Sequence, residues 1–307
     1  MSFCYDLSEV KPYKVIKTLP PKARTKAEKI LIKVDGHEVE AFRKSTEDEE
    51  VARLIQHQAE SIELVNAIGA KSNPSFRAPK TYDFGPGFII TEWIDGEPLS
   101  KSLGGEPEKS AAILAPMLYA FDKFGVKPQI APSYSFFKPF AESMAVWRED
   151  IQARIEAALM DQDLFDRTVR LLDQLYPKLT SCLQDADIKP DHLYPDPAGQ
   201  ADFVLIDSEH IRDNWPRYYD LGNLIAKYAV SKPLPAFRKK LLEDFLELCQ
   251  TPPTEIFDPL RATLLVRGLG FTKEFELPPT TDPEPKKKLI TELLEKTLSA
   301  KTLQDLI

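Results

Sequence analysis

Residues 183–213 constrain the fold of this 307-residue chain more than any other stretch. Two short apolar runs, 193–194 and 203–206, flank a segment rich in Pro, Asp and Gly, and this order predicts a β-hairpin. Because the two strands of a hairpin run antiparallel, the loop before the first strand and the end of the second strand meet at the open end of the hairpin. The polar residues expected at that end are Asp187, Lys189, His192 and Asp207.

This stretch resembles the catalytic and metal-binding loops of the aminoglycoside phosphotransferase-like family, the small-molecule branch of the protein-kinase-like fold. The family's loop reads roughly His-Gly-Asp-x-x-x-x-Asn, and residues 185–192 read Asp-Ala-Asp-Ile-Lys-Pro-Asp-His. The family's next strand ends Ile-Asp-Trp-Glu, and residues 206–209 read Ile-Asp-Ser-Glu. Residues 217–224 look like the family's Asp-Pro-x-x-Tyr-Asp-Leu-Ala segment. Three motifs in the same order are more specific than any one alone.

The resemblance implies a role for each polar residue at this end of the hairpin. Asp187 would accept or orient the proton of an attacking hydroxyl, and Lys189 would steady the transferring phosphate. Asp207 would hold Mg²⁺ beside the phosphates of ATP or GTP, because this ion prefers carboxylate oxygen. His192 stands where the family has a second metal ligand, usually Asn. The family's opening His is Asp185 here.

A two-lobed α+β architecture follows from the resemblance: a small β-sheet lobe over residues 1–95 and a mainly helical lobe over residues 96–307. The third strand, 38–45, should carry the cation that meets the nucleotide phosphates. Alternation puts Arg43 and Lys44 on opposite faces of that strand. The family's spacing favours Arg43, and Lys44 is the alternative.

A helix is expected from about 48 to 68, since its apolar residues recur at helical spacing. The family places an ion-pairing Glu at Glu60, with Glu63 one turn later; a solvated surface Glu is an equally good interpretation of either. After the strand that begins at Phe88, the backbone groups of Glu92, Trp93 and Ile94 would bind the nucleotide base.

The rest of the chain is expected to be mostly helical. The predicted helices are 110–124, 137–160, 164–182, 221–230, 236–249 and 285–303. Aromatic residues between 134 and 147 could line a substrate cleft or fill the core.

The composition excludes several classes of protein. A formal net charge of −8 argues against a nucleic-acid binder and is compatible with a cationic small substrate. No apolar stretch approaches the length of a membrane span, and the three widely spaced cysteines form no zinc or disulfide pattern. We therefore expect a cytoplasmic protein with no membrane partner.

The sequence favours an ATP- or GTP-dependent phosphotransferase that phosphorylates a hydroxyl of a small molecule. The alternative is a nucleotide-binding pseudokinase or scaffold without turnover. Asp185, His192 and the absence of glycine from the loop 20–29 favour that alternative.

Overall fold

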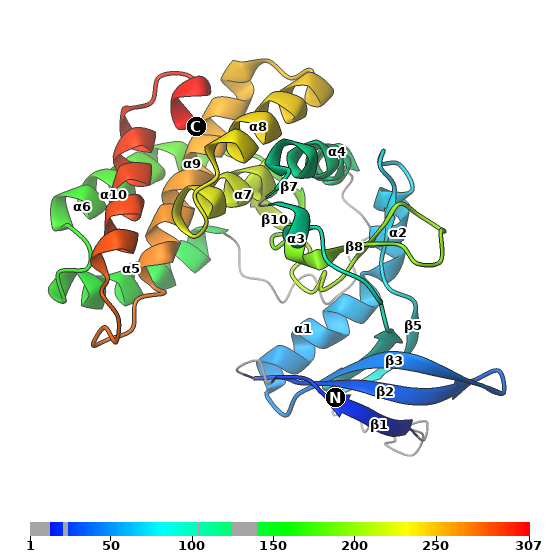
Figure 1. Ribbon diagram of the computed structural model, residues 1–307. Helices are drawn as coiled ribbons and strands as arrows, with labels where there is room; N and C mark the ends of the chain where they lie inside the picture. Colours follow the sequence, from blue (N-terminus) through cyan, green and yellow to red (C-terminus); the bar gives the residue numbers. More distant parts are fainter. Residues whose placement is uncertain (1–12, 21–23, 104, 125–139) are drawn as a thin grey trace.

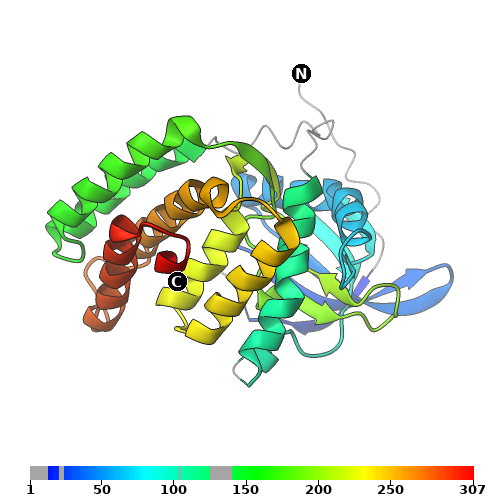
Figure 2. The same cartoon turned by 90° about the horizontal axis from the view of Figure 1, so that it is seen from above.

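The computed structural model describes residues 13–20, 24–103, 105–124 and 140–307. A five-stranded antiparallel sheet lies at one end of the molecule, and a body of helices forms the other (Figures 1 and 2). The strands, in their order across the sheet, are β1 (Tyr13–Thr18), β2 (Lys26–Val34), β3 (His37–Ser45), β6 (Phe88–Glu92) and β5 (Thr81–Gly85). Asp35 and Gly36 both have positive φ in the tight turn between β2 and β3, as the Asp-Gly pair predicts.

Two successive helices follow β3 where the sequence predicted one. They are α1 (Glu49–Glu60) and α2 (Ile62–Gly69). Asp48 caps the first, because its side chain accepts a hydrogen bond from the Val51 N–H. The break is at Ser61, whose hydroxyl donates to the carbonyl of His57, the kind of back-bonding that bends helices.

The predicted hairpin is present and is part of a second, three-stranded sheet. β8 (Leu193–Pro195) pairs antiparallel with β9 (Phe203–Leu205), and β9 pairs parallel with β4 (Phe76–Arg77). The strand from the first third of the chain thus joins the hairpin from the second half. A short pair, β7 (Ser181–Gln184) and β10 (Arg212–Pro216), frames the same region.

Eight helices in the described ranges follow β6 (Figure 1). They are α3 (Ser100–Leu103), α4 (Pro107–Phe124), α5 (Phe140–Glu156), α6 (Gln162–Leu175), α7 (Tyr219–Val230), α8 (Pro235–Cys249), α9 (Pro253–Thr272) and α10 (Glu284–Ser299). None of the helices in the described ranges combines the length and the apolar character needed to cross a bilayer.

Two of these helices differ from the sequence prediction. The predicted helix 164–182 ends at Leu175, because the chain turns at Tyr176–Lys178 and then enters β7. The 20-residue helix α9 was not predicted: Pro259, Gly268 and Gly270 within it are helix-breaking signals, and its apolar residues are distributed around most of its circumference. Such a helix is stabilised by being surrounded, and α9 packs against α6, α7 and α10.

The main apolar core does not follow the predicted boundary at residue 95. It contains buried residues of the helical body together with Val65 and Ile68 of α2 and Phe76 of β4. The rings of Phe76 and Phe121 stack with their centroids 5.7 Å apart. The division into lobes 1–95 and 96–307 stays a prediction, and α2 and β4 pack on the helical side of it.

Candidate active site

A cavity of about 500 Å³ lies between the five-stranded sheet and the hairpin. Phe42 and Lys44 of β3 line one wall, and Tyr194 and Asp207 line the opposite one. Glu92, the last residue of β6, and the following Trp93 and Ile94 close one end. Its size and its mainly apolar lining, with a few charged groups at one end, are typical of a small-ligand site.

Strand alternation decides which cation faces this cavity. Lys44 lies on the cavity face of β3, where only 11% of its side chain is exposed. Arg43 points to the other face, where it donates to Glu28 at 2.9 Å and lies over the Tyr13 ring. The structure therefore brings Lys44, and not Arg43, to the predicted site.

Lys44 is held by two carboxylates from the segment after β9. Its Nζ donates to Asp207 Oδ1 at 2.8 Å and also to Glu209 Oε2. Both carboxylates raise the pKa of Lys44 and outweigh burial, which alone would lower it. The lysine is therefore charged and fixed at the end of the cavity.

Glu60 does not take part in this ion pair. It is exposed and accepts a hydrogen bond from Gln56 at 2.8 Å. The reason is helical geometry: α1 faces the cavity with Gln58, and a residue two positions later lies about 200° around the axis. Glu63 is also exposed. Gln58 and Glu209 are the site residues that the sequence analysis missed, although Glu209 belongs to the Ile-Asp-Ser-Glu motif.

His192 lies between the two predicted carboxylates. Its Nε2 is 3.6 Å from Asp207 Oδ2, and its Nδ1 is 3.9 Å from Asp187 Oδ2. Lys189 Nζ donates to Asp187 Oδ2 at 2.5 Å. Lys44, Asp207, His192, Asp187 and Lys189 thus form one continuous polar row.

The backbone brings these groups together through two unusual conformations. Asp207 has φ 64° two residues after β9, and Ala186 has φ 67° in the loop before Asp187. Left-handed backbone is uncommon for residues other than glycine and is concentrated at functional sites. The Ile206 N–H donates to the His192 carbonyl at 2.9 Å, which ties the strand end to the loop.

Asp220, at the start of α7, holds the loop before Asp187 through hydrogen bonds to its backbone. Its carboxylate accepts the N–H groups of Asp185 at 2.8 Å and of Ala186 at 2.7 Å. Asp185 is itself buried, and its Oδ1 accepts the Asp187 N–H at 3.2 Å. Two carboxyl groups therefore lie together in the core beneath Asp187.

The donor set suits Mg²⁺ only with phosphate oxygens as additional ligands. No group of three or more His, Cys, Asp or Glu side chains in the described ranges could hold a metal ion by itself. Mg²⁺ in nucleotide enzymes is bound through one or two carboxylates plus substrate phosphates, so Asp207 fits such a site. The His192 imidazole suits this ion less well than an oxygen ligand.

Two lysines, Lys189 and Lys227, lie close to the loop that carries Asp187. Lys227 of α7 lies 3.8 Å from Asp191, and the nearby Lys189 lowers the pKa of Lys227 together with burial, which is the larger cause. The predicted aromatic segment lies partly outside the described residues; within them, Trp147 packs against the core under Lys273.

Comparison with solved structures identifies the architecture. The aminoglycoside phosphotransferase APH(2")-IIia, solved with GDP and kanamycin, matches with a TM-score of 0.57 and 16% identity over 92% of this chain and 93% of that one. Spectinomycin phosphotransferase APH(9)-Ia, solved with ADP and spectinomycin, matches at 0.55 and 14%, covering 92% of both chains. Choline kinase from Cryptosporidium parvum matches at 0.55 and 14% over 93% of this chain and 88% of that one.

The chain has the protein-kinase-like fold of these small-molecule kinases. The predicted fold class is confirmed. At these identities the likeness concerns the fold alone. No protein-family model matches the sequence, and no curated protein matches it.

Proposed function

We propose that this protein transfers the γ-phosphoryl group of ATP or GTP to a hydroxyl of a small molecule. The observation that supports this most is the row of groups at the end of the cavity. Lys44 Nζ is 2.8 Å from Asp207 Oδ1, and His192 links Asp207 to Asp187 at 3.6 and 3.9 Å. Phosphoryl transfer requires a phosphate clamp, a metal-binding carboxylate and a base in such an order.

Each group has a distinct task in the proposed reaction. The backbone of Glu92, Trp93 and Ile94 binds the base, which directs the phosphates towards Lys44. Lys44 neutralises phosphate charge at a position fixed by Asp207 and Glu209. Asp207, with His192 beside it, holds Mg²⁺, which when bound neutralises charge on the phosphate oxygens.

Asp187 orients the acceptor hydroxyl and takes its proton. Lys189 holds Asp187 Oδ2 at 2.5 Å in the ligand-free protein. A lysine there holds the carboxylate in place and can follow the transferring phosphate as a point charge. Arg43 and Glu60 have no role in the proposed mechanism, because their side chains lie outside the cavity.

The test is a nucleotide titration followed by a transfer assay on a panel of alcohols. The protein should bind ATP or GTP with Mg²⁺ and release the corresponding diphosphate when the right alcohol is present. Asp187→Asn should lower turnover at least about 100-fold, since general-base catalysis contributes that much, without a large loss of stability. Asp173→Asn, on the exposed face of α6, is the matched control. Full activity of Asp187→Asn would refute the role of this residue.

The alternative is a nucleotide-binding protein without turnover. It is favoured by Asp185, which replaces the family's His in a buried position, and by His192 at the second metal position. Nucleotide binding with no diphosphate release, across the whole panel of alcohols, would support this alternative.

A further inference from the structure

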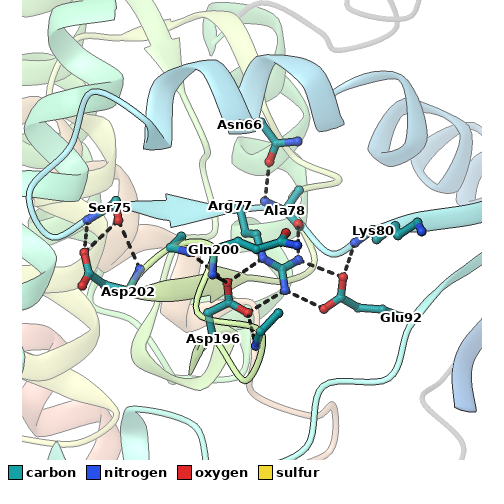
Figure 3. A network of polar contacts seen from close by, with 11 residues as sticks. Asn66, Ser75, Arg77, Ala78, Lys80, Glu92, Asp196, Gln200 and Asp202 are labelled. Atoms are coloured by element: carbon teal, nitrogen blue, oxygen red, sulfur yellow. Dashed lines mark hydrogen bonds and ion pairs between the residues drawn. The ribbon is translucent and has the colours of Figure 1, made fainter.

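Arg77 joins two segments that are far apart in the sequence and meet beside the cavity (Figure 3). Its guanidinium donates to both oxygens of Glu92, at 2.8 and 2.7 Å, and to both oxygens of Asp196, at 2.8 and 2.6 Å. It also donates to the Ala78 carbonyl at 3.2 Å. These contacts use all five N–H groups of the arginine. Glu92 is the last residue of β6, and Asp196 follows β8 in the hairpin turn.

Both carboxylates are also fixed by backbone groups. Asp196 accepts the N–H groups of Ala198, Gln200 and Ala201 at 2.9–3.0 Å, so it organises the whole turn. Glu92 Oε2 accepts the Lys80 N–H at 2.7 Å. The guanidinium is therefore held between two anions that cannot move independently of their segments.

Burial makes the arrangement specific for arginine. The side chain of Asp196 is 0% exposed, that of Arg77 12% and that of Glu92 16%. The hydrogen bonds from Arg77 hold the pKa of Asp196 far below its usual range, so this carboxylate is ionised. A lysine carries the same charge but has no planar fork to bind two carboxylates at once.

The two joined segments form the hinge end of the cavity. Glu92, Trp93 and Ile94 line it from one side, and Tyr194 of β8 and Ile206, which follows β9, line it from the other. Arg77 bridges the two walls, because it binds Glu92 on one segment and Asp196 on the other. A second link, from Ser75 to Asp202 at 2.7 Å, fixes the hairpin to β4 but does not reach the hinge.

We propose that Arg77 is a positioning residue that holds the hinge and the hairpin at a fixed separation and keeps the base-binding end of the cavity preformed. A preformed site binds more tightly because less ordering is required on binding. The identity of the ligand rests on the proposed function, whereas the coupling of the two segments does not.

The experiment compares Arg77→Lys with Arg167→Lys. Arg167 makes a similar two-pronged pair with Glu295 between α6 and α10, away from the cavity, and serves as the matched control. Amide hydrogen exchange of residues 92–96 and 193–206 is measured in the ligand-free protein. The Kd of ATP with Mg²⁺, and the kcat and KM of any transfer reaction, are measured in parallel.

We expect Arg77→Lys to speed exchange in both segments about tenfold and to weaken ATP binding about tenfold, with kcat and the KM of the alcohol little changed. Arg167→Lys should change neither exchange nor binding. The proposal is overturned if exchange in the hairpin stays at the wild-type rate, if the Kd of ATP stays within about twofold, or if the control gives the same loss.

A second variant covers a folding failure of Arg77→Lys. Glu92→Gln keeps the buried pair of Arg77 and Asp196 and removes only the ionic link to the hinge, so the same two changes are expected at smaller size. If the wild-type protein binds no nucleotide, the proposed function and the base-binding part of this proposal both fall. In that case, hydrogen exchange by itself still tests whether Arg77 couples the hinge to the hairpin.

Discussion

Ala186 shows how a single residue stores strain at the candidate active site. Its φ of 67° is held by the two hydrogen bonds that Asp220 accepts from the loop. A left-handed backbone costs a residue with a Cβ about 1–2 kcal/mol, which glycine avoids. The loop that residues 185–192 resemble has glycine at the position of Ala186. The left-handed backbone at this position gives a physical reason for that glycine.

Replacing Ala186 with glycine should therefore stabilise the protein. We expect Ala186→Gly to raise the free energy of unfolding by up to about 1 kcal/mol, because the relief of strain exceeds the added entropy of the unfolded chain. Urea denaturation measures this. Ala153→Gly, in the exposed face of helix α5, should instead lower stability by about 1 kcal/mol. A loss of stability in Ala186→Gly would mean that the loop is not strained.

The buried carboxyl pair beneath the loop predicts a dependence of stability on pH. Burial raises the pKa of Asp185 well above its usual range and that of Asp220 to about 7, with the charge of Asp187 adding to both. Asp220 accepts two N–H groups, which favour its ionised form, so the shared proton belongs on Asp185. The pair keeps protons that the unfolded chain releases near pH 4.

The direction of the pH dependence follows from the difference in protons bound by the folded and unfolded states. Below about pH 4 both states are protonated and the pair costs nothing, whereas between about 4 and 7 the folded state binds more protons. The free energy of unfolding should therefore fall as the pH rises through that range. Asp185→Asn, whose amide oxygen can still accept the Asp187 N–H, should flatten this fall and stabilise the protein at pH 8 by about 1–3 kcal/mol. Denaturation curves from pH 4 to 8 measure it, and an unchanged slope would contradict the assignment.

At the scale of elements, helix α7 positions the loop through its packing on α9. Gly222 permits the close approach: a Cβ there would lie 2.5 Å from Thr263 Cγ2 and 2.7 Å from Thr263 Cβ. Thr263 is fully buried and its hydroxyl is bonded to the Pro259 carbonyl, so it has no room to move. Asp220 lies two residues before Gly222 in the same helix, so its position depends on this spacing.

Gly222→Ala should push the two helices apart and destabilise the protein by about 1–3 kcal/mol. Because α7 carries Asp220, turnover should fall as well. Gly270→Ala in α9 is the control, since a Cβ there would meet no atom closer than Trp147 at 3.4 Å, and the gain in helix propensity should make it neutral or stabilising. Thermal unfolding compares the two, and equal effects would show that the contact at Thr263 is not limiting.

At the scale of the whole molecule, the cavity depends on two walls that come from different parts of the chain. β3 provides Lys44 and the segment after β9 provides Asp207 and Glu209, and their ion pairs join the two walls at the end of the cavity (Figure 1 shows β3 opposite the hairpin). A nucleotide that binds between these walls would stabilise both.

ATP with Mg²⁺ at 100 times its Kd should therefore add about 2.7 kcal/mol to the free energy of unfolding and raise the Tm by several degrees. Lys44→Met should remove this increase, because the phosphate clamp is lost. Lys33→Met, at an exposed position of β2, should keep it. A wild-type Tm that does not respond to either ATP or GTP would argue against the proposed function.

Local sequence patterns predicted the elements whose stability is local. The Asp-Gly turn, the hairpin and the presence of most amphipathic helices were predicted correctly, because alternation, turn residues and helical periodicity act over a few residues. Helix α9 was missed because its stability comes from neighbours on most sides, which override Pro259 and its glycines. The division of the predicted long helix at Ser61 depends on one hydroxyl-to-carbonyl bond and has no periodic signal.

The sequence by itself determined the order of the motifs, and the three motifs at 185–192, 206–209 and 217–224 in the family's order were enough to predict the fold class. Only the tertiary structure decided that Lys44 faces the cavity, that Glu209 and not Glu60 holds it, and that Arg77 joins Glu92 to Asp196. These contacts span between 15 and 165 residues. The sequence fixes neither strand register nor helix rotation at that range, because both are set by packing against distant segments.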